Sequence, residues 1–221
     1  MICANTDPRI LDLYEYAGQN GFSEDLFLQE DNREKYVATA LDGYRDYPLF
    51  LYVFGGKYDE KAFSRMMSID FKSRLRTTAG IASSSDYESI MLIEPPMTKK
   101  TGMLQYVKVA TPESYSLLFV PAMYRQEAFE RYALKMRRDF LDDKTWYMYI
   151  FATKKEFQHR GYGKKLMNVI ITYAGRNGYR ICLETNHLDN ITLYEHFGFE
   201  LMSLSVYKDE LEHCVMLFNS H

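Results

Sequence analysis

The sequence predicts an α/β domain in which helices flank a mixed, mostly antiparallel, twisted sheet. Short apolar runs typical of strands alternate with stretches in which apolar residues recur every three or four positions, which is typical of helices. At one place, residues 146–174, a strand, a glycine-bearing turn and a helix follow one another directly. A helix between two strands favours parallel pairing there, within a sheet that is otherwise antiparallel.

The length and composition indicate one folded domain. The chain has 221 residues, of which 47% are hydrophobic and 26% are charged, so it can bury a full core. We expect residues 1–24 to form an extension with a helix from Pro8 to Ala17, and residues 25–221 to form the domain. The net charge of −3 gives no overall attraction to nucleic acid or to an anionic membrane.

The cysteines, the histidines and the N-terminal sequence predict a cytoplasmic protein without a metal site. Cys3, Cys182 and Cys214 show no Cys-x-x-Cys spacing, which favours reduced thiols in the core. The N-terminus lacks the basic start and apolar segment of a signal peptide, and no run approaches the roughly 18 apolar residues of a membrane span. The histidines likewise lack the spacing of a ligand set.

The other elements follow from periodicity and from turn residues. We expect strands at residues 26–28, at two short segments between 77 and 93, and at 146–152, 179–185, 199–207 and 212–218. We expect helices beginning at Arg33, after Asp59, near Met123 and after Gly163, the last stopped by Asn177-Gly178, and another at 190–197. Residues 97–121 show no clean period.

The turn Gln158-His159-Arg160-Gly161-Tyr162-Gly163 predicts a phosphate site. Free backbone N–H groups at the start of a helix lie at the positive end of its dipole and bind anions well. Gly161 and Gly163 place no Cβ in the way of an anion, and Arg160, Lys164 and Lys165 add positive charge. The pattern is neither a P-loop, which needs Gly-Lys-Ser/Thr, nor a dinucleotide fingerprint, because Leu166 stands where the third glycine would be.

The turn resembles the Gln/Arg-x-x-Gly-x-Gly/Ala acyl-CoA motif of the GNAT superfamily of N-acetyltransferases. Residues 190–199, Asn-Ile-Thr-Leu-Tyr-Glu-His-Phe-Gly-Phe, are similar to a second motif of that family at the expected separation. Trp146-Tyr147 and Leu183-Glu184-Thr185 resemble its puromycin-acetyltransferase-like branch. The resemblance covers about residues 145–218, the expected acyl-CoA-binding core. Thr153 and Lys155 depart from the usual Val and Pro.

The resemblance implies acetyl-CoA as co-substrate and a GNAT-like fold. The loop amides would hold the pyrophosphate, and the central strand would part from its neighbour so that its amides reach the pantetheine arm and the thioester. Asn190 either bonds that arm or caps the following helix. The implied cofactor-binding residues are Phe151, Ala152, Thr153, Gln158, His159, Arg160, Gly161, Tyr162, Gly163, Lys164 and Asn190.

Two residues are candidates for proton transfer. Tyr194 occupies the family position of a tyrosine that faces the sulfur, where a phenol can donate to a departing thiolate; the alternative is a tyrosine that only fills the core. Glu184, at the end of a strand, is the candidate general base; the alternative is a surface glutamate in an ion pair.

These features predict an acyl-CoA-dependent N-acyltransferase that moves an acetyl group to a primary amine by direct attack in a ternary complex. No Cys or Ser has a base at motif spacing, so no covalent intermediate is expected. The alternative, from another class, is a non-catalytic module that binds or senses acyl-CoA. We expect a small-molecule or peptide amine as acceptor, with its identity unread, and the sequence leaves a homodimer open.

Overall fold

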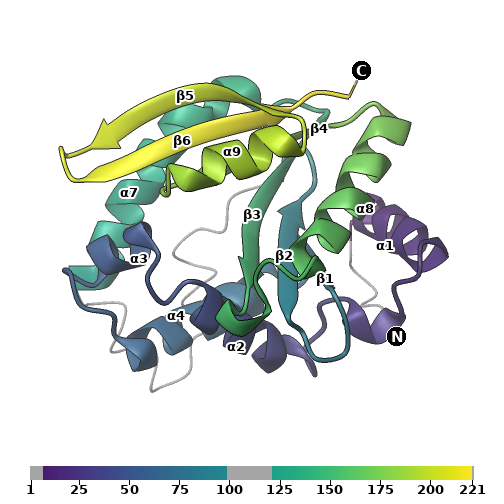
Figure 1. Ribbon diagram of the computed structural model, residues 1–221, viewed down its shortest axis with the longest axis horizontal. Coiled ribbons are helices and arrows are strands. Elements are labelled where there is room, and N and C mark those ends of the chain that lie inside the picture. Colours follow the sequence, from purple (N-terminus) through teal and green to yellow (C-terminus); the bar gives the residue numbers. More distant parts are fainter. Residues whose placement is uncertain (1–6, 99–120, 221) are drawn as a thin grey trace.

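A computed structural model of the protein describes residues 7–98 and 121–220 (Figure 1). Six strands form one sheet in the order β1-β2-β3-β4-β6-β5. The strands are β1 (Ala79–Ala82), β2 (Ser89–Glu94), β3 (Thr145–Thr153), β4 (Arg180–Thr185), β5 (Phe199–Tyr207) and β6 (Leu211–Phe218). Only β3 and β4 pair in parallel; the other neighbours in this sheet are antiparallel. The predicted mixed sheet is confirmed.

Helices cover both faces of the sheet. They are α1 (Pro8–Gln19), α2 (Arg33–Gly43), α3 (Pro48–Val53), α4 (Glu60–Arg74), α7 (Pro121–Arg137), α8 (Tyr162–Asn177) and α9 (Asp189–His196). Neighbouring residues of a strand point to opposite faces. Trp146 of β3 packs against Tyr173 of α8, whereas Tyr147 lies under the guanidinium group of Arg137 in α7. The sheet therefore separates α8, with α1 beside it (Figure 1), from α7.

The helix α8 could be predicted from its local sequence. Its buried side chains recur at helical spacing and are Leu166, Met167, Val169, Ile170, Tyr173 and Ala174. The helix ends at Gly178, which has a φ of 65° and adopts the left-handed conformation that glycine tolerates. The helix α4 also begins where expected, after Asp59, whose carboxylate accepts the N–H of Ala62 at 2.9 Å.

Two local predictions are wrong. Residues 26–28 do not form a strand: a 3₁₀ turn spans Glu24–Leu26, and Phe27 makes only an isolated bridge with Ile81 at the edge of β1. These apolar side chains are buried by packing rather than by pairing. The helix α3 was missed, because six residues beginning at Pro48 are too few to display a helical period.

The N-terminal helix belongs to the same hydrophobic core as the sheet. Ile10, Leu13 and Ala17 of α1 are buried in the cluster that also contains Trp146, and the hydroxyl of Tyr173 in α8 donates to Asp12 at 2.7 Å. The boundary expected at residue 24 stays a prediction. Residues 99–120, where no period was found, lie outside the described part of the chain.

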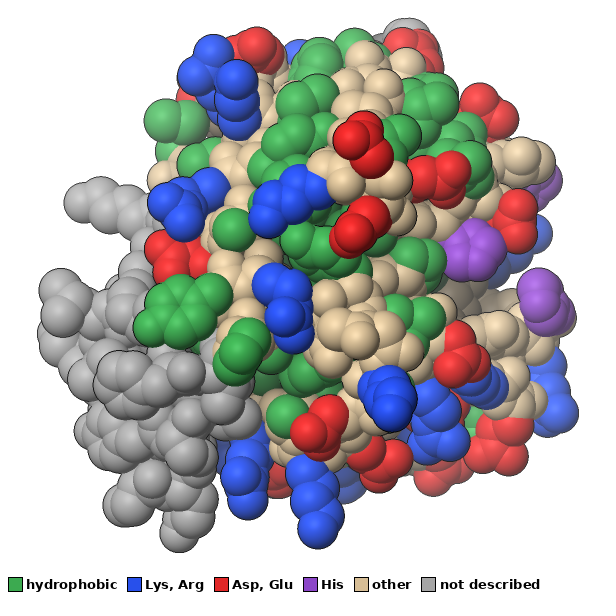
Figure 2. Space-filling model, turned by 90° about the vertical axis from the view of Figure 1, so that its left-hand side faces the viewer, with side chains coloured by type: hydrophobic (Ala, Val, Ile, Leu, Met, Phe, Trp, Pro, Cys, Tyr) green, Lys and Arg blue, Asp and Glu red, His purple; other side chains and the backbone are tan. Residues whose placement is uncertain are grey.

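The surface of the described residues carries charges of both signs. On the face shown in Figure 2, acidic and basic side chains are interspersed with apolar ones. Within residues 7–98 and 121–220, no helix is long and apolar enough to cross a bilayer.

Candidate functional site

The two parallel strands part halfway along their length. Pairing of β3 with β4 runs from Thr145↔Arg180 to Met148↔Leu183 and stops there, although β3 continues to Thr153 beside β2. At the same point the register with β2 shifts, because Leu92 pairs with Ile150 and Ile93 with Met148, which makes Tyr149 an extra residue in β3. A bulge of this kind bends a strand, and here it coincides with the parting.

A cavity of about 660 Å³ lies at this parting. It is open to solvent and runs from the start of α8 to the end of β4. Every residue of the predicted site except Arg160 contributes to its lining: Phe151, Ala152, Thr153, Gln158, His159, Gly161, Tyr162, Gly163, Lys164, Glu184, Asn190 and Tyr194. Residues that the sequence placed in two separate motifs therefore share one cavity.

The glycine loop has the backbone conformation that its sequence requires. Gly161 precedes α8 with a φ of 89°, and a Cβ at this position would meet nothing within 4 Å. The glycine thus serves the turn and leaves open space in front of the helix. At Gly163 the reason differs, because a Cβ would approach the ring of Phe151 to 3.0 Å. His159 also has a positive φ, of 60°.

The three positive charges around the loop do not lie together. Lys164 lines the cavity, and the guanidinium group of Arg160 lies 5.5 Å from the centre of the Phe157 ring. Lys165 is turned away, because its ammonium group donates to the carbonyl of Ser83 at 2.8 Å. The expectation that Lys165 supports the anion site is therefore wrong, and Lys164 is the lysine at the loop.

Two tyrosines that the sequence analysis missed lie in the gap between the strands. The hydroxyl of Tyr44 accepts the N–H of Phe151 at 3.1 Å and donates to the carbonyl of the same residue at 3.2 Å. The hydroxyl of Tyr47 accepts the N–H of Asn186 at 2.7 Å and lies 3.2 Å from the Thr185 hydroxyl. Nothing in the segment after α2 signals these contacts in advance, because each partner is more than a hundred residues away.

Tyr194 lies on α9 with only 6% of its surface exposed. Its ring packs near Phe151 and Phe199, with centroid distances of 6.5 and 5.8 Å. Burial raises the pKa of Tyr194 well above its ordinary value, and Tyr47 and Tyr44 raise it further. The side chain is therefore an uncharged phenol at neutral pH and a hydrogen-bond donor at the cavity wall.

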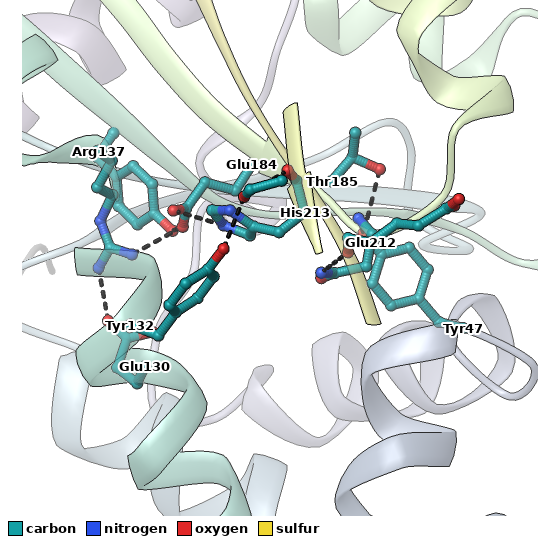
Figure 3. A network of polar contacts seen from close by, with 11 residues as sticks. Tyr47, Glu130, Tyr132, Arg137, Glu184, Thr185, Glu212 and His213 are labelled. Atoms are coloured by element: carbon teal, nitrogen blue, oxygen red, sulfur yellow. Dashed lines mark hydrogen bonds and ion pairs between the residues drawn. The ribbon is translucent and has the colours of Figure 1, made fainter. Parts of the chain in front are cut away.

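The carboxylate of Glu184 contacts side chains from three elements; Figure 3 shows Arg137 and His213 beside it. Its Oε2 accepts a guanidinium N–H of Arg137 at 2.7 Å and the hydroxyl of Tyr147 at 2.6 Å. Its Oε1 lies 3.0 Å from Nε2 of His213. Arg137 in turn donates to Glu130 at 2.5 Å. Glu184 is therefore neither a loose surface residue nor a free carboxylate.

Burial and neighbouring groups shift the pKa of Arg137 and of Tyr147. Burial lowers the pKa of Arg137, but Tyr147, Glu184 and Glu130 raise it by more, so the guanidinium group stays charged. Burial also raises the pKa of Tyr147 well above its usual range. Its hydroxyl consequently remains protonated and donates to Glu184.

The remaining predicted residues are accounted for as follows. Asn190 does not cap α9, because the helix begins at Asp189 after Leu188; its amide donates instead to the Thr185 hydroxyl at 3.0 Å. Cys182 and Cys214 are buried and unpaired, and burial raises the pKa of both thiols. Among the described residues, no group of three or more His, Cys, Asp or Glu side chains is arranged to hold a metal ion.

Part of the chain that carries the site is similar to known proteins. Residues 131–201 match the family model described as an acetyltransferase (GNAT) domain. An uncharacterized N-acetyltransferase of Schizosaccharomyces pombe is 40% identical over 58 residues, which make up 26% of this chain and 24% of that protein. The alignment thus spans about a quarter of that relative's length.

Solved structures share the fold. The histone acetyltransferase HPA2 and related acetyltransferase of Corynebacterium glutamicum superposes with a TM-score of 0.57 and 17% identity, over 88% of this chain and 96% of that one. The arylalkylamine N-acetyltransferase 2 of Aedes aegypti gives a TM-score of 0.55 and 15% identity, over 88% and 98%. Residues 131–201, which include the glycine loop, Glu184 and Tyr194, are thus similar to an acetyltransferase (GNAT) domain, and the solved structures share the fold of the described chain.

Proposed function

We propose that the protein is an acyl-CoA-dependent N-acyltransferase that moves the acetyl group of acetyl-CoA to a primary amine. The family implies acetyl-CoA as co-substrate. The observation that carries the proposal is the one cavity that joins the start of α8 to Tyr194 and Glu184. The residues suit the cofactor, because helix N-terminal amides beside Lys164 attract a pyrophosphate, and the parted edge of β3 offers backbone groups to an amide-bearing arm.

The reaction proposed is direct attack in a ternary complex. The amine nitrogen, neutral after it has lost one proton to solvent, forms a bond to the acetyl carbon; the carbon–sulfur bond breaks, and the second proton that the nitrogen loses passes to Glu184. The phenol of Tyr194 donates its proton to the departing thiolate, and solvent then restores both side chains. Each proton transfer of this kind contributes roughly 10²–10⁴-fold to the rate.

A covalent acyl-enzyme does not fit the cysteines of the described chain. Cys182 and Cys214 are buried, and burial raises the pKa of each thiol. A thiol must ionise to act as a nucleophile, and burial in apolar surroundings opposes this. Transfer from acetyl-CoA straight to the amine therefore needs no intermediate carrier.

We take the acceptor to be a small molecule or a peptide with a primary amine. One structural neighbour is named as an arylalkylamine N-acetyltransferase, and at 15% identity its likeness concerns the fold. The support from this chain is Glu184 at the cavity wall, which would accept a proton from an amine.

Two measurements on the full chain test the proposal. Acetyl-CoA at about a hundred times its Kd should stabilise the folded protein by about 2.7 kcal/mol, seen as a raised melting temperature. A thiol reagent should then report CoA release that depends on an added amine, with an amine-free reaction as the hydrolysis control. Stabilisation without turnover across a broad amine panel would favour the non-catalytic binding module. A cooperative melt unmoved by millimolar CoA would overturn the proposal.

A further inference from the structure

His213 lies directly behind the candidate base and is completely buried. It belongs to β6 and has no exposed surface. Its ring stands edge-on to the rings of Phe129 and Tyr132, with centroids 5.5 and 5.6 Å away. Its Nε2 lies 3.0 Å from Oε1 of Glu184 (Figure 3). His213 is therefore packed like a core residue, but its Nε2 faces Glu184 in the site.

The hydrogen bonds fix the tautomer of this ring. The carboxylate of Glu184 forms an ion pair with the guanidinium group of Arg137 at 2.7 Å, and its Oε2 also accepts the hydroxyl of Tyr147. An ionised carboxylate accepts only, so Nε2 of His213 donates to Oε1. The other ring nitrogen, Nδ1, is buried without a hydrogen-bond partner among the described residues. A tautomer with its proton on Nδ1 would leave an unpaired buried donor, which is costly.

The same bonds leave Glu184 with one accepting position at the cavity. A carboxylate offers about four lone-pair sites. Two sites on Oε2 are taken by Arg137 and Tyr147, and one on Oε1 is taken by His213. Because Glu184 lines the cavity, the remaining site on Oε1 is the one that an amine proton would reach.

We propose that His213 is a positioning residue, whose Nε2–H holds Oε1 of Glu184 in place at the cavity wall. The inference rests on the proposed N-acyltransferase function. The titratable groups that face this pair come from α7, β3 and β4, and are Glu130, Tyr132, Arg137, Tyr147 and Cys182. Without this donor, the remaining hydrogen bonds from Arg137 and Tyr147 hold Oε2 of Glu184 and leave Oε1 without a fixed position.

The test compares kcat/KM for the amine and KM for acetyl-CoA in wild type, His213→Phe and His213→Gln. His213→Phe keeps a ring of similar size without a donor, and we expect kcat/KM for the amine to fall about tenfold, as for the loss of one hydrogen bond to a charged group, while KM for acetyl-CoA holds. His213→Gln, which can still donate, should recover part of the loss. Tyr132→Phe, which touches the same ring but bonds Ser205, is the matched control and should leave kcat/KM unchanged.

A second readout does not depend on turnover or on a variant that folds. Nitrogen chemical shifts of the imidazole in the wild-type protein should show a proton on Nε2, the ring nitrogen that faces Glu184. A proton on Nδ1 alone, or a His213→Phe variant that keeps the wild-type kcat/KM for the amine, would overturn the inference. Absence of amine-dependent turnover in wild type would instead overturn the proposed function, and with it the role given to Glu184.

Discussion

The glycine loop comes from one continuous segment, residues 158–164, whereas Glu184 is held by side chains from α7, β3 and β6. The loop acts through its backbone, so its conformation is encoded in neighbouring residues such as Gly161. The Glu184 cluster acts through side chains that lie 29 to 47 residues from Glu184 in the sequence. Cofactor binding should therefore respond to local backbone changes, and proton transfer to changes in distant elements.

Tyr194→Phe gives the largest expected effect, because Tyr194 lies where the two regions meet. The substitution keeps the ring that packs on Phe151 and Phe199 and removes the donor to the thiolate. We expect kcat to fall by roughly 10²–10⁴-fold with little change in KM for acetyl-CoA.

The matched control for that variant is Tyr173→Phe, which removes a buried hydroxyl bonded to Asp12, away from the cavity. It should change stability and leave kcat in place. If Tyr194→Phe stays within about threefold of wild type when chemistry limits turnover, Tyr194 fills the core only. A loss of CoA affinity at constant kcat would move Tyr194 to the binding region.

Two glycine variants distinguish the effect of a Cβ on CoA binding from its effect on backbone strain. Gly161 and Gly178 flank α8, both have positive φ, and a Cβ at either would meet nothing within 4 Å. Replacing either by Ala costs about 1–2 kcal/mol of folding free energy. Only Gly161→Ala should also weaken CoA binding, by about tenfold, or 1.4 kcal/mol, measured by titration calorimetry. Equal CoA affinities for the two variants would move the pyrophosphate away from this loop.

Tyr44→Phe should have the smallest effect and the opposite sign. The Tyr44 hydroxyl occupies both backbone groups of Phe151, which the pantetheine arm would need. A typical hydrogen bond contributes about 0.5–1.5 kcal/mol net, so we expect CoA to bind roughly threefold more tightly without this competitor. Tyr47→Phe, whose hydroxyl bonds Asn186 instead, should leave the affinity unchanged. Weaker binding by Tyr44→Phe would mean that its hydroxyl contacts the cofactor.

The sequence was informative where structure is local. The strand before the loop, the helix α8 and its end at Gly178 follow from periodicity and glycine. Local patterns failed at residues 26–28, where buried apolar residues make an isolated bridge instead of a strand, and at Asn190, where a favoured capping residue bonds a neighbouring hydroxyl inside the helix. In both cases tertiary contacts outweighed a local preference.

The partners of Glu184 could not be predicted from the sequence either, because they too are brought together by tertiary contacts. Arg137 is the last residue of α7, and nothing in the sequence of this helix indicates that its guanidinium group contacts Glu184. His213 carried one usable signal, because the register that pairs Glu184 with Val215 places His213 on the same face, two residues along β6. That register becomes known only once the order of the strands is known.

The contact of Tyr44 with Phe151 also bears on whether another strand can pair with the exposed edge of β3. Where β3 leaves β4, the sheet has an unpaired strand edge in its interior, and such an edge is a template on which a strand of another chain can add. The hydroxyl of Tyr44 engages the N–H and the carbonyl at the middle of that edge. A single side chain thus satisfies, at one residue, the two backbone groups with which an added strand would pair.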